Sequence, residues 1–600
     1  MSETIPARKD VPVAHTWKLE DIFESNEAWD REYEALQTMP EKLAAYPGKL
    51  GTDARALYDF FRLEDELSVR LTALHSYANC RSDEDTTNSL YIDRKGKAIR
   101  VWVAVSEALA FAAPEIISIR EETLTRFYAE CPALHEYDRS LYLIRRKTEH
   151  VLSPECETLL AATGEMAEGP ENINASLMNA DLTFPPVSDK DGQEHPLTNS
   201  TLVPLLMSAD RTLRKNAFTA YYTQLGAFKN TIAASLDACF KQMKFYANAR
   251  RYPSMLEASL FSHEIPVSVY HSLIEAVHEN MDKMYAYVAL RKKMLGVDSL
   301  HMYDVYTPLV EDAAEKISFE TAKSTVLEAL AVLGEDYAAL LQEGFDNRWI
   351  DVYENKGKRS GAYSTSVSRP HPYVLLNHKD DLDSMFTLAH EMGHALHSYH
   401  STKYQPVSTS DYVIFVAEVA STCNEVLLMR YLLAHTEDKN KRIYLLNHFL
   451  DQFKGTLYRQ TMFAEFELEM AQMCEGGEAL TADALCEKYL ALNRLYFGEE
   501  MVSDGEIALE WARIPHFFSN FYVFQYATGF SAAVAIANRI LCEGQPAVDD
   551  YKKFLSSGSC ADPISLLKIA GVDMSTPEPV NSALRLFGEL VDELRTLTEQ

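Results

Sequence analysis

LAHEMGHALHSYH, residues 388–400, is the stretch that tells most about the fold and the chemistry of this chain. Apolar residues recur along it at helical spacing, and Asp381 or Asp383 can cap a helix that begins just before it. The pattern therefore predicts a helix with one apolar stripe. The stripe consists of Met385, Leu388, Met392, Leu396 and Tyr399.

His390 and His394 lie one helical turn apart in this stretch, and Glu391 follows the first of them. Four residues correspond to about 40° around a helix axis, so both imidazoles lie on one face, away from the apolar stripe. The pattern H-E-x-x-H is typical of a zinc site in which two imidazoles bind one ion and the glutamate takes a proton from a water molecule at the metal. Surface histidines on an ordinary helix are the alternative interpretation.

A catalytic zinc ion keeps three protein ligands and one open position, so a third ligand is required. His400 has the spacing of a longer zinc motif, but His397 stands where that motif has glycine. Glu418 is the favoured candidate because it lies in the largely apolar YVIFVAEVASTCNEVLLMR, residues 412–430, where a carboxylate needs a cation. Glu425 could hold a ligand imidazole by its second nitrogen, or be an ordinary surface or packing residue.

Length and composition bound the class of protein. With 600 residues and 67.8 kDa the chain exceeds one ordinary core, so two or more lobes are expected. Hydrophobic residues make up 47% and charged residues 24%, as in folded globular proteins. The net charge of −31 opposes attraction to nucleic acids and anionic membranes, so neither is an expected partner.

The sequence pattern favours helices. Glycine is scarce, at 23 of 600 residues, and apolar residues recur three and four apart over long stretches. The clearest early example comprises Leu57, Phe60, Phe61, Leu67, Leu71 and Leu74. Residues 182–202 interrupt the pattern, and Asp191-Gly192 there predicts a hairpin at a junction of lobes. Residues 349–377 predict two or three strands of a small sheet before the histidine helix.

Cysteine usage and the N-terminal residues bear on the compartment. Nine cysteines are scattered singly without a C-x-x-C pair, which is typical of free thiols in a reducing compartment. The first residues, MSETIPARKD, lack the apolar stretch of a signal peptide, and no run of about 18 uncharged apolar residues occurs. A soluble cytoplasmic protein is therefore expected.

HEMGH, the later FVAEVASTCNE, and the segments GAYS and RIPHFFSNFYVFQYATG resemble the thimet oligopeptidase and oligoendopeptidase F family of zinc peptidases, over roughly residues 199–586. The resemblance implies a mainly α, two-lobed helical zinc-peptidase fold of the neurolysin type, with a deep channel and a small β-sheet beside the zinc helix. It implies one Zn²⁺ per chain, bound by His390, His394 and Glu418, and a water molecule activated by Glu391. The implied activity is that of a zinc metalloendopeptidase that hydrolyses internal bonds of short peptides.

The aromatic segment at residues 513–529 borders the metal if the resemblance holds. His516, Tyr522 and Tyr526 are then expected to donate hydrogen bonds to the oxyanion that forms when water attacks the scissile carbonyl. The choice between the two tyrosines stays open, and core packing is the ordinary role of such residues. The strand at residues 372–377 could pair with an extended substrate, or belong only to a structural sheet.

The division of the chain also follows from the resemblance. Residues 1–195 are expected to form an N-terminal helical region that supplies part of the channel wall, and residues 196–600 the catalytic domain. Gly361-Ala362-Tyr363 resembles a turn that faces the substrate in that family. Oligopeptides are the expected partners. A zinc carboxypeptidase with a related helical channel, or a non-catalytic helical binding protein, are the alternatives.

Overall fold

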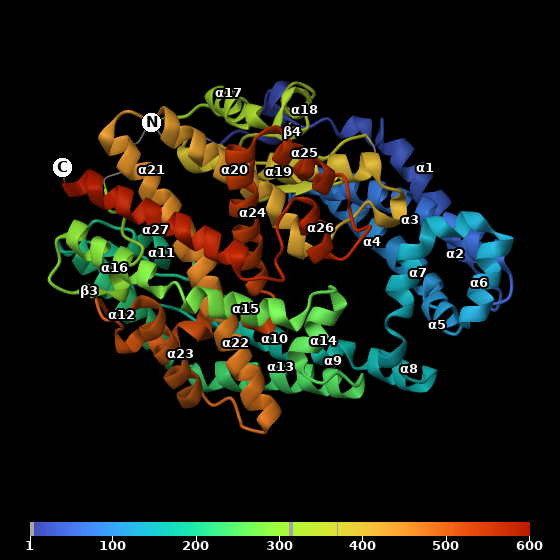
Figure 1. Cartoon of the computed structure of the whole chain (residues 1–600), viewed down its shortest axis with the longest axis horizontal. Coiled ribbons are helices and arrows are strands. Elements are labelled where there is room, and N and C mark those ends of the chain that lie inside the picture. The colour runs from blue at the N-terminus through green and yellow to red at the C-terminus, as the bar shows by residue number, and fades with distance from the viewer. Residues whose placement is uncertain (1–4, 311–315, 369, 600) are drawn as a thin grey trace. The chain divides into compact units, whose positions relative to one another are not determined.

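The computed structural model describes residues 5–310, 316–368 and 370–599, and Figure 1 shows the course of the chain. Helices dominate these residues, which confirms the expected mainly α fold. The chain divides into two compact units. Unit 1 comprises Met1–Glu149, Ala314–Leu428 and Ile536–Gly571, and unit 2 comprises His150–Ala313, Met429–Ala535 and Val572–Gln600. This division rests on the compactness of each unit. The boundary at residue 195 between the two predicted functional regions stays a prediction.

Unit 1 contains N-terminal helices, the histidine helix and two late helices. Its α-helices are α1 (Asn26–Gln37), α2 (Met39–Leu43), α3 (Ala54–Glu84), α4 (Ser89–Leu109), α5 (Ala112–Ile117), α6 (Glu121–Glu130), α7 (Asp138–Arg145), α17 (Phe319–Leu330), α18 (Glu335–Asp346), α19 (Leu382–Tyr404), α25 (Gln545–Leu555) and α26 (Pro563–Ile569). Helices α20 (Ile414–His435) and α24 (Phe524–Glu543) contain points where the chain passes from one unit to the other.

One hydrophobic core joins the N-terminal helices of unit 1 to its small sheet. Helices α3 and α4 lie side by side, and all six residues of the predicted stripe on α3 are buried. Trp29 is fully buried and its indole N–H donates a hydrogen bond at 2.9 Å to the Leu74 carbonyl. Tyr373 and Leu375 of the sheet belong to the same core. The sheet is therefore anchored on the N-terminal helices.

The small sheet of unit 1 has three strands in the order β4-β6-β5, which confirms the predicted strands. β6 (Tyr373–Leu375) runs parallel to β4 (Ile350–Asp351) and antiparallel to β5 (Tyr363–Thr365). Both edges of β6 are therefore paired within the protein, and the expectation that the strand at residues 372–377 could pair with a substrate is wrong. β5 and β6 pack against α19, so a small sheet does lie beside the histidine helix.

Unit 2 is built mainly from packed helices. Its α-helices are α8 (Pro154–Ala162), α9 (Gly164–Ala167), α10 (Gly169–Ser176), α11 (Leu202–Leu206), α12 (Arg211–Gly226), α13 (Lys229–Ala249), α14 (Met255–Ser262), α15 (Val267–His278), α16 (Met281–Leu295), α21 (Lys439–Gln452), α22 (Arg459–Gly476), α23 (Ala482–Phe497) and α27 (Glu578–Glu599). A π-helical turn at Phe453–Tyr458 joins α21 to α22.

Short strands complete unit 2. β1 (Val187–Ser188) pairs antiparallel with β2 (Glu194–His195), which confirms the predicted hairpin. Gly192 in its turn has φ +81°, a conformation that favours glycine. β3 (Leu300–His301) pairs parallel with β7 (Met501–Val502).

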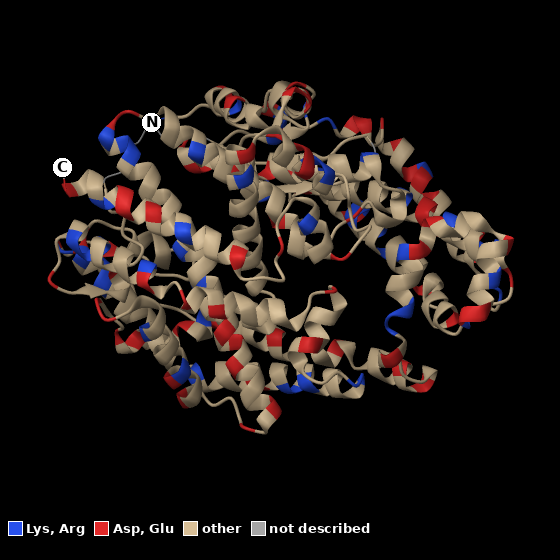
Figure 2. Ribbon diagram, viewed as in Figure 1, with Lys and Arg blue, Asp and Glu red and all other residues tan. Residues whose placement is uncertain are grey.

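Charged residues are interspersed along the helices, with both signs present in each unit (Figure 2). Among the described residues, no single helix has the length and apolar character needed to cross a membrane. One bent pair of helical segments, Ser89–Ile117 with Glu121–Glu130, has the length and composition of a span, and nothing more points to a membrane role for it.

Candidate metal centre

Helix α19 presents both motif histidines on one partly exposed face. Asp381 caps the helix and accepts a hydrogen bond at 2.8 Å from the backbone N–H of Ser384. The predicted stripe is buried at Met385, Leu388, Met392 and Leu396. Because this stripe packs inward, the imidazoles of His390 and His394 lie together on another face, with ring centroids 4.8 Å apart.

A buried asparagine holds the following helix against the motif. The side-chain amide of Asn424 on α20 donates a hydrogen bond at 3.1 Å to the carbonyl of Ala389, the residue before His390. Its amide oxygen accepts a hydrogen bond at 3.2 Å from the Tyr337 hydroxyl. Asn424 was not among the residues predicted for the site. Its only signal is a polar residue of low helix propensity within an apolar helical run.

Glu418 of α20 meets both histidines. Its Oε2 lies 3.3 Å from Nε2 of His390 and 3.4 Å from Nε2 of His394. One ligand atom from each of the three residues lies within 4.8 Å of the others. Two ligands of a tetrahedral zinc ion at about 2.0–2.1 Å are separated by about 3.3 Å, so the nitrogen–oxygen distances suit one such ion. The three side chains therefore form a fitting donor set for a metal.

The charges of this group are mutually dependent. Burial opposes a charged imidazole, but the hydrogen bonds with Glu418 and Glu425 raise the pKa of His390 well above its ordinary value. Burial likewise opposes the carboxylate, but the hydrogen bonds with the two histidines lower the pKa of Glu418. Positive charge therefore stabilises Glu418 in this position, and a divalent cation would supply it in place of protons.

Glu425 orients the first histidine. Its Oε1 accepts a hydrogen bond at 2.5 Å from Nδ1 of His390. The expected hydrogen bond between Glu425 and the second nitrogen of a motif imidazole is thus present, while the role of His390 as a metal ligand stays a prediction. Because Nδ1 carries the proton in this bond, the lone pair of Nε2 is free to bind a metal, and the ring has one fixed orientation.

Glu391 lies beside the donor set in a buried position. The residue is 7% exposed, and its Oε2 has no hydrogen-bond partner within the residues that the structure covers. Burial raises the pKa of Glu391, although the two neighbouring histidines oppose this effect. A buried carboxyl oxygen without a partner has the free lone pairs that a proton acceptor needs.

His400 lies outside the donor set. Its ring stacks at 6.5 Å on Tyr337 and at 6.1 Å on Tyr404, measured between ring centroids. Burial lowers its pKa to about 4. Among the described residues, the group of converging ligand atoms contains Glu418 and not His400. The structure thus favours Glu418 over His400 as the third ligand.

Gly361 and Ala362 of the turn at residues 361–363 border a cavity together with the start of α19. Gly361 has φ +83°, and its carbonyl accepts a hydrogen bond at 2.7 Å from the side chain of Asn377. The Tyr363 hydroxyl donates at 2.9 Å to Asp83 of α3. The cavity measures about 270 Å³, and Thr387 of α19 also lines it. These two hydrogen bonds tie the turn to α3 and to the segment that follows β6.

His516, Tyr522 and Tyr526 come together in unit 2. The ring of His516 is parallel to that of Tyr522 at 6.1 Å and perpendicular to that of Tyr526 at 6.1 Å. The Tyr526 hydroxyl donates a hydrogen bond at 3.3 Å to the Tyr522 hydroxyl. Burial, with the nearby positive charge of Arg459, lowers the pKa of His516. The three predicted donors thus form one group, with a histidine biased towards its neutral form.

Two histidines of H-E-x-x-H and a glutamate of the next helix around one point, in a mainly helical protein, are a donor set typical of metallopeptidases. The sequence matches peptidase family M3 over residues 205–586 and oligopeptidase F over residues 115–184. The chain belongs to peptidase family M3. It is a metal-dependent endopeptidase that cleaves internal bonds of oligopeptides, as expected from the sequence.

Three similar proteins illustrate the relationship. Oligopeptidase PepF of Bacillus subtilis is 46% identical, over 99% of this chain and 88% of the relative. The crystal structure of oligoendopeptidase-F from Enterococcus faecium has a TM-score of 0.75 and 35% identity, over 96% of this chain and 99% of that one. A solved chain from Chlamydophila abortus has a TM-score of 0.93 and 32% identity, over 99% of this chain and 100% of that one.

Proposed function

We propose that the metal of this endopeptidase is zinc, one ion per chain, held by His390, His394 and Glu418. The observation that carries the proposal is the convergence of one ligand atom from each residue within 4.8 Å. Two imidazole nitrogens and one carboxylate oxygen are a donor set typical of catalytic zinc, which keeps a fourth position open. Calcium and magnesium prefer oxygen ligands in larger number, so this set disfavours them.

Glu391 is proposed as the general base. When bound, zinc supplies a Lewis acid that polarises the scissile carbonyl and lowers the pKa of a water molecule. Glu391 accepts the proton of the attacking water at its unpartnered oxygen and then delivers it to the leaving amine. Its burial restricts competing hydrogen bonds from solvent, and the neighbouring helix turn fixes its distance from the histidines.

His516 with Tyr522 or Tyr526 is proposed to stabilise the oxyanion. A neutral imidazole N–H and a phenol O–H both donate hydrogen bonds to developing negative charge. The lowered pKa of His516 keeps its ring largely neutral near pH 7. What supports this role is the resemblance of residues 513–529 to the family and the grouping of these three side chains in unit 2.

Short peptides are the proposed substrates, with the N-terminal region, residues 1–195, supplying part of a channel wall that excludes folded proteins. Lys and Arg are interspersed with Asp and Glu along the helices in the view of Figure 2, and the net charge is −31, so nucleic acids and anionic membranes are not proposed as partners. A cytoplasmic location is proposed from the scattered free cysteines.

The test combines metal analysis with product analysis. Purified protein should contain about one zinc per chain, and Glu418→Ala should lose it. Mass spectrometry of the products of one defined ten-residue peptide should show internal fragments, while intact casein should survive the same incubation. A different metal in fully active enzyme, or full zinc content in Glu418→Ala, would contradict the proposed centre.

A further inference from the structure

The segment between His516 and Tyr522 contains a strained backbone. Phe521 has φ +50°, in the left-handed region that residues with bulky side chains rarely adopt. Such a conformation persists only where surrounding groups hold it, and these conformations cluster at functional sites. The groups that hold Phe521 therefore also determine where its neighbour Tyr522 lies.

Glu467 of α22 holds the backbone of Phe521. Its Oε1 accepts a hydrogen bond at 2.7 Å from the Phe521 N–H. Glu467 is 0% exposed, and its Oε2 has no partner among the residues described. The Phe521 ring is also buried and meets Tyr270 edge-on at 5.7 Å. The φ angle describes rotation about the N–Cα bond. The N–H at one end of this bond and the side chain at the other are both fixed, so the φ angle of Phe521 is fixed as well.

Burial favours the neutral form of the Glu467 carboxyl group. Complete burial raises its pKa well above the ordinary value, and the hydrogen bond from Phe521 only partly opposes this effect. In the neutral acid, the oxygen that accepts the Phe521 N–H is the carbonyl oxygen. A glutamine side chain has the same shape and a carbonyl in the same place, so it can make the same bond.

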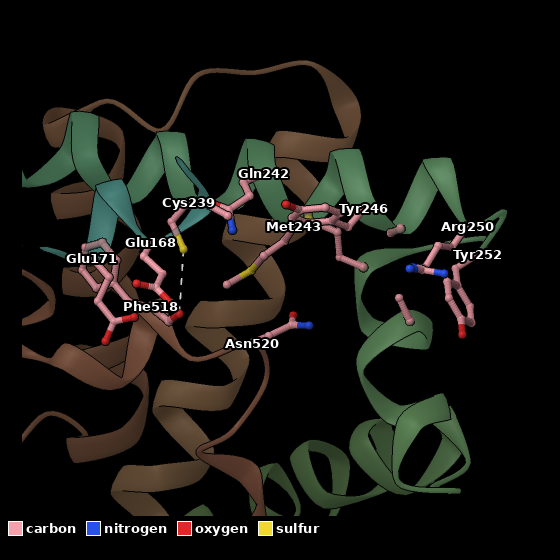
Figure 3. Close-up of a pocket in the computed structure, with 14 residues that line it drawn as sticks. Glu168, Glu171, Cys239, Gln242, Met243, Tyr246, Arg250, Tyr252, Phe518 and Asn520 are labelled. Carbon is pink, nitrogen blue, oxygen red and sulfur yellow. Dashed lines mark hydrogen bonds between the residues drawn. The ribbon is translucent and has the colours of Figure 1, made fainter. Parts of the chain in front are cut away.

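The rest of the segment makes further hydrogen bonds and lines a cavity. The Phe518 carbonyl accepts a hydrogen bond from Cys239 at 3.8 Å, and the Asn520 carbonyl accepts one from Ser259 at 2.9 Å. Figure 3 shows Phe518 and Asn520 at a cavity of about 450 Å³, which Met243 of α13 also lines. The cavity leaves fewer packed neighbours on this side, while the buried Phe517 ring packs on Phe466 with ring centroids 5.3 Å apart.

We propose that Glu467 is a positioning residue for peptide hydrolysis, because its carboxyl group holds Phe521 in the left-handed conformation and so sets the places of His516 and Tyr522. Two turns transmit this constraint. The Ser519 N–H donates to the His516 carbonyl at 2.9 Å, and the Tyr522 N–H donates to the Ser519 carbonyl at 3.2 Å. The inference rests on the proposed role of His516 and a tyrosine as oxyanion donors.

The first test compares Glu467→Gln with Glu467→Met in the zinc-loaded enzyme, with a short quenched fluorescent peptide as substrate. Glu467→Gln should keep kcat within about twofold and leave the pH profile unchanged, because it preserves the acceptor. Glu467→Met should lower kcat about 10- to 100-fold with KM within about threefold, because donors displaced by a fraction of an ångström stabilise the transition state poorly. Zinc content should stay unchanged in both. Unchanged kcat in Glu467→Met, or equal losses in both variants, would overturn the proposal.

A matched variant separates positioning from general destabilisation. Leu446→Ala removes a fully buried side chain from α21 in the same unit, so it should lower thermal stability but keep kcat below its unfolding temperature. An equal loss of kcat in Leu446→Ala would overturn the positioning role. If Glu467→Met does not fold, Glu467→Asp replaces it, since its shorter side chain withdraws the acceptor from Phe521 and should lower kcat about tenfold.

A double-mutant cycle separates this inference from the proposed function. In a His516→Phe, Tyr522→Phe background, Glu467→Met should lower kcat by less than about twofold, because the groups it positions are gone. Additive losses would overturn the role of Glu467 and leave the oxyanion donors standing. Full activity in the His516→Phe, Tyr522→Phe background would instead refute the donors themselves, and the positioning role with them.

Discussion

A Cβ atom on Gly393 would lie 2.6 Å from the Cα atom of Ser421, so helices α19 and α20 meet backbone to backbone at this point. The Ala420 carbonyl oxygen would lie only 2.8 Å from the same atom. Glu418 lies one turn before Ser421, whose hydroxyl donates a hydrogen bond at 3.1 Å to Glu418 Oε2. The close approach therefore brings Glu418 within reach of the histidines, and the glycine of HEMGH has a geometric role.

Gly393→Ala should push the two helices apart and break the donor set. The neighbouring atoms belong to backbone and cannot rotate away, so the expected cost is about 1–3 kcal/mol of folding stability, as for an overpacked core. Metal ligands tolerate errors of only about 0.2 Å, so zinc content should fall severalfold or more. Thermal unfolding and metal analysis of the purified variant measure both effects.

Gly455→Ala is the matched control. Gly455 lies in the helical turn Phe453–Tyr458, and a Cβ atom there would meet nothing within 4 Å. This variant should keep its zinc and its stability, since alanine suits a helix better than glycine does. Normal zinc content in Gly393→Ala would show that the helix contact does not govern the site.

Local patterns in the sequence predicted much of the metal centre. Helical spacing and the H-E-x-x-H motif identify the face of α19 that carries His390 and His394, because both depend on residues close in the chain. Glu418 could be chosen because a lone carboxylate in an apolar helix needs a partner. Glu425 could be predicted because it lies two helical turns after Glu418, on nearly the same face of the helix.

Contacts between distant segments could not be predicted. Nothing in the sequence shows that β6 lies between β4 and β5, because strand order depends on pairing across the chain. Asn424 and Glu467 act through hydrogen bonds to residues 35 and 54 positions away. The spacing of residues gives no indication of such partners, so these two residues became visible only in the structure.

Removing the hydrogen bond to His390 should weaken metal binding. Glu425→Ala takes away the acceptor 2.5 Å from Nδ1, so the ring loses its fixed orientation and some basicity. The expected loss is about 10- to 100-fold in zinc affinity, measured by competition with a chelator. Glu425→Gln, which keeps an acceptor but not the charge, should lose less.

His400→Ala serves as the comparison for that experiment. His400 stacks on tyrosines and does not belong to the donor set, so its removal should leave zinc affinity unchanged. Loss of zinc in His400→Ala, with zinc retained in Glu418→Ala, would reverse the assignment of the third ligand.

Glu391→Gln should separate catalysis from metal binding. The substitution keeps the volume of a side chain that is only 7% exposed, but it removes the proton acceptor. We expect kcat to fall about 10²- to 10⁴-fold while zinc content stays at the wild-type level. Asp383→Asn, an exposed change in the first turn of the same helix, should keep full activity. Wild-type turnover in Glu391→Gln would refute the role of general base.

A buried ion network lies in unit 2 just before His516 in the chain. Glu510 accepts hydrogen bonds from Arg459 at 2.7 Å, from Arg513 at 3.0 Å and from the Tyr489 hydroxyl at 2.6 Å. Glu510 is 4% exposed. Burial opposes its charge, but the two arginines outweigh burial and lower the pKa of Glu510 to about 2. The carboxylate is therefore more stable in the folded chain than in the unfolded one.

The pH dependence of stability should report this network. Because the folded pKa of about 2 lies below the ordinary value of 4.5, the stabilisation is fully present above about pH 4.5 and is lost as the pH falls towards 2. The difference between the folded and the ordinary pKa corresponds to about 3 kcal/mol of folding stability at pH 7. Glu510→Gln should lose about this amount, since it leaves two partly buried arginines without their anion. The difference in urea unfolding midpoint between wild type and Glu510→Gln should therefore be the same at pH 7 and pH 5, and this difference should narrow below pH 4.5.

Asp483→Asn is the control for this experiment. It breaks the exposed pair with Lys229 and should leave the midpoint nearly unchanged at each pH. If the midpoint difference between wild type and Glu510→Gln stays constant down to pH 3, the charge of Glu510 does not stabilise the fold.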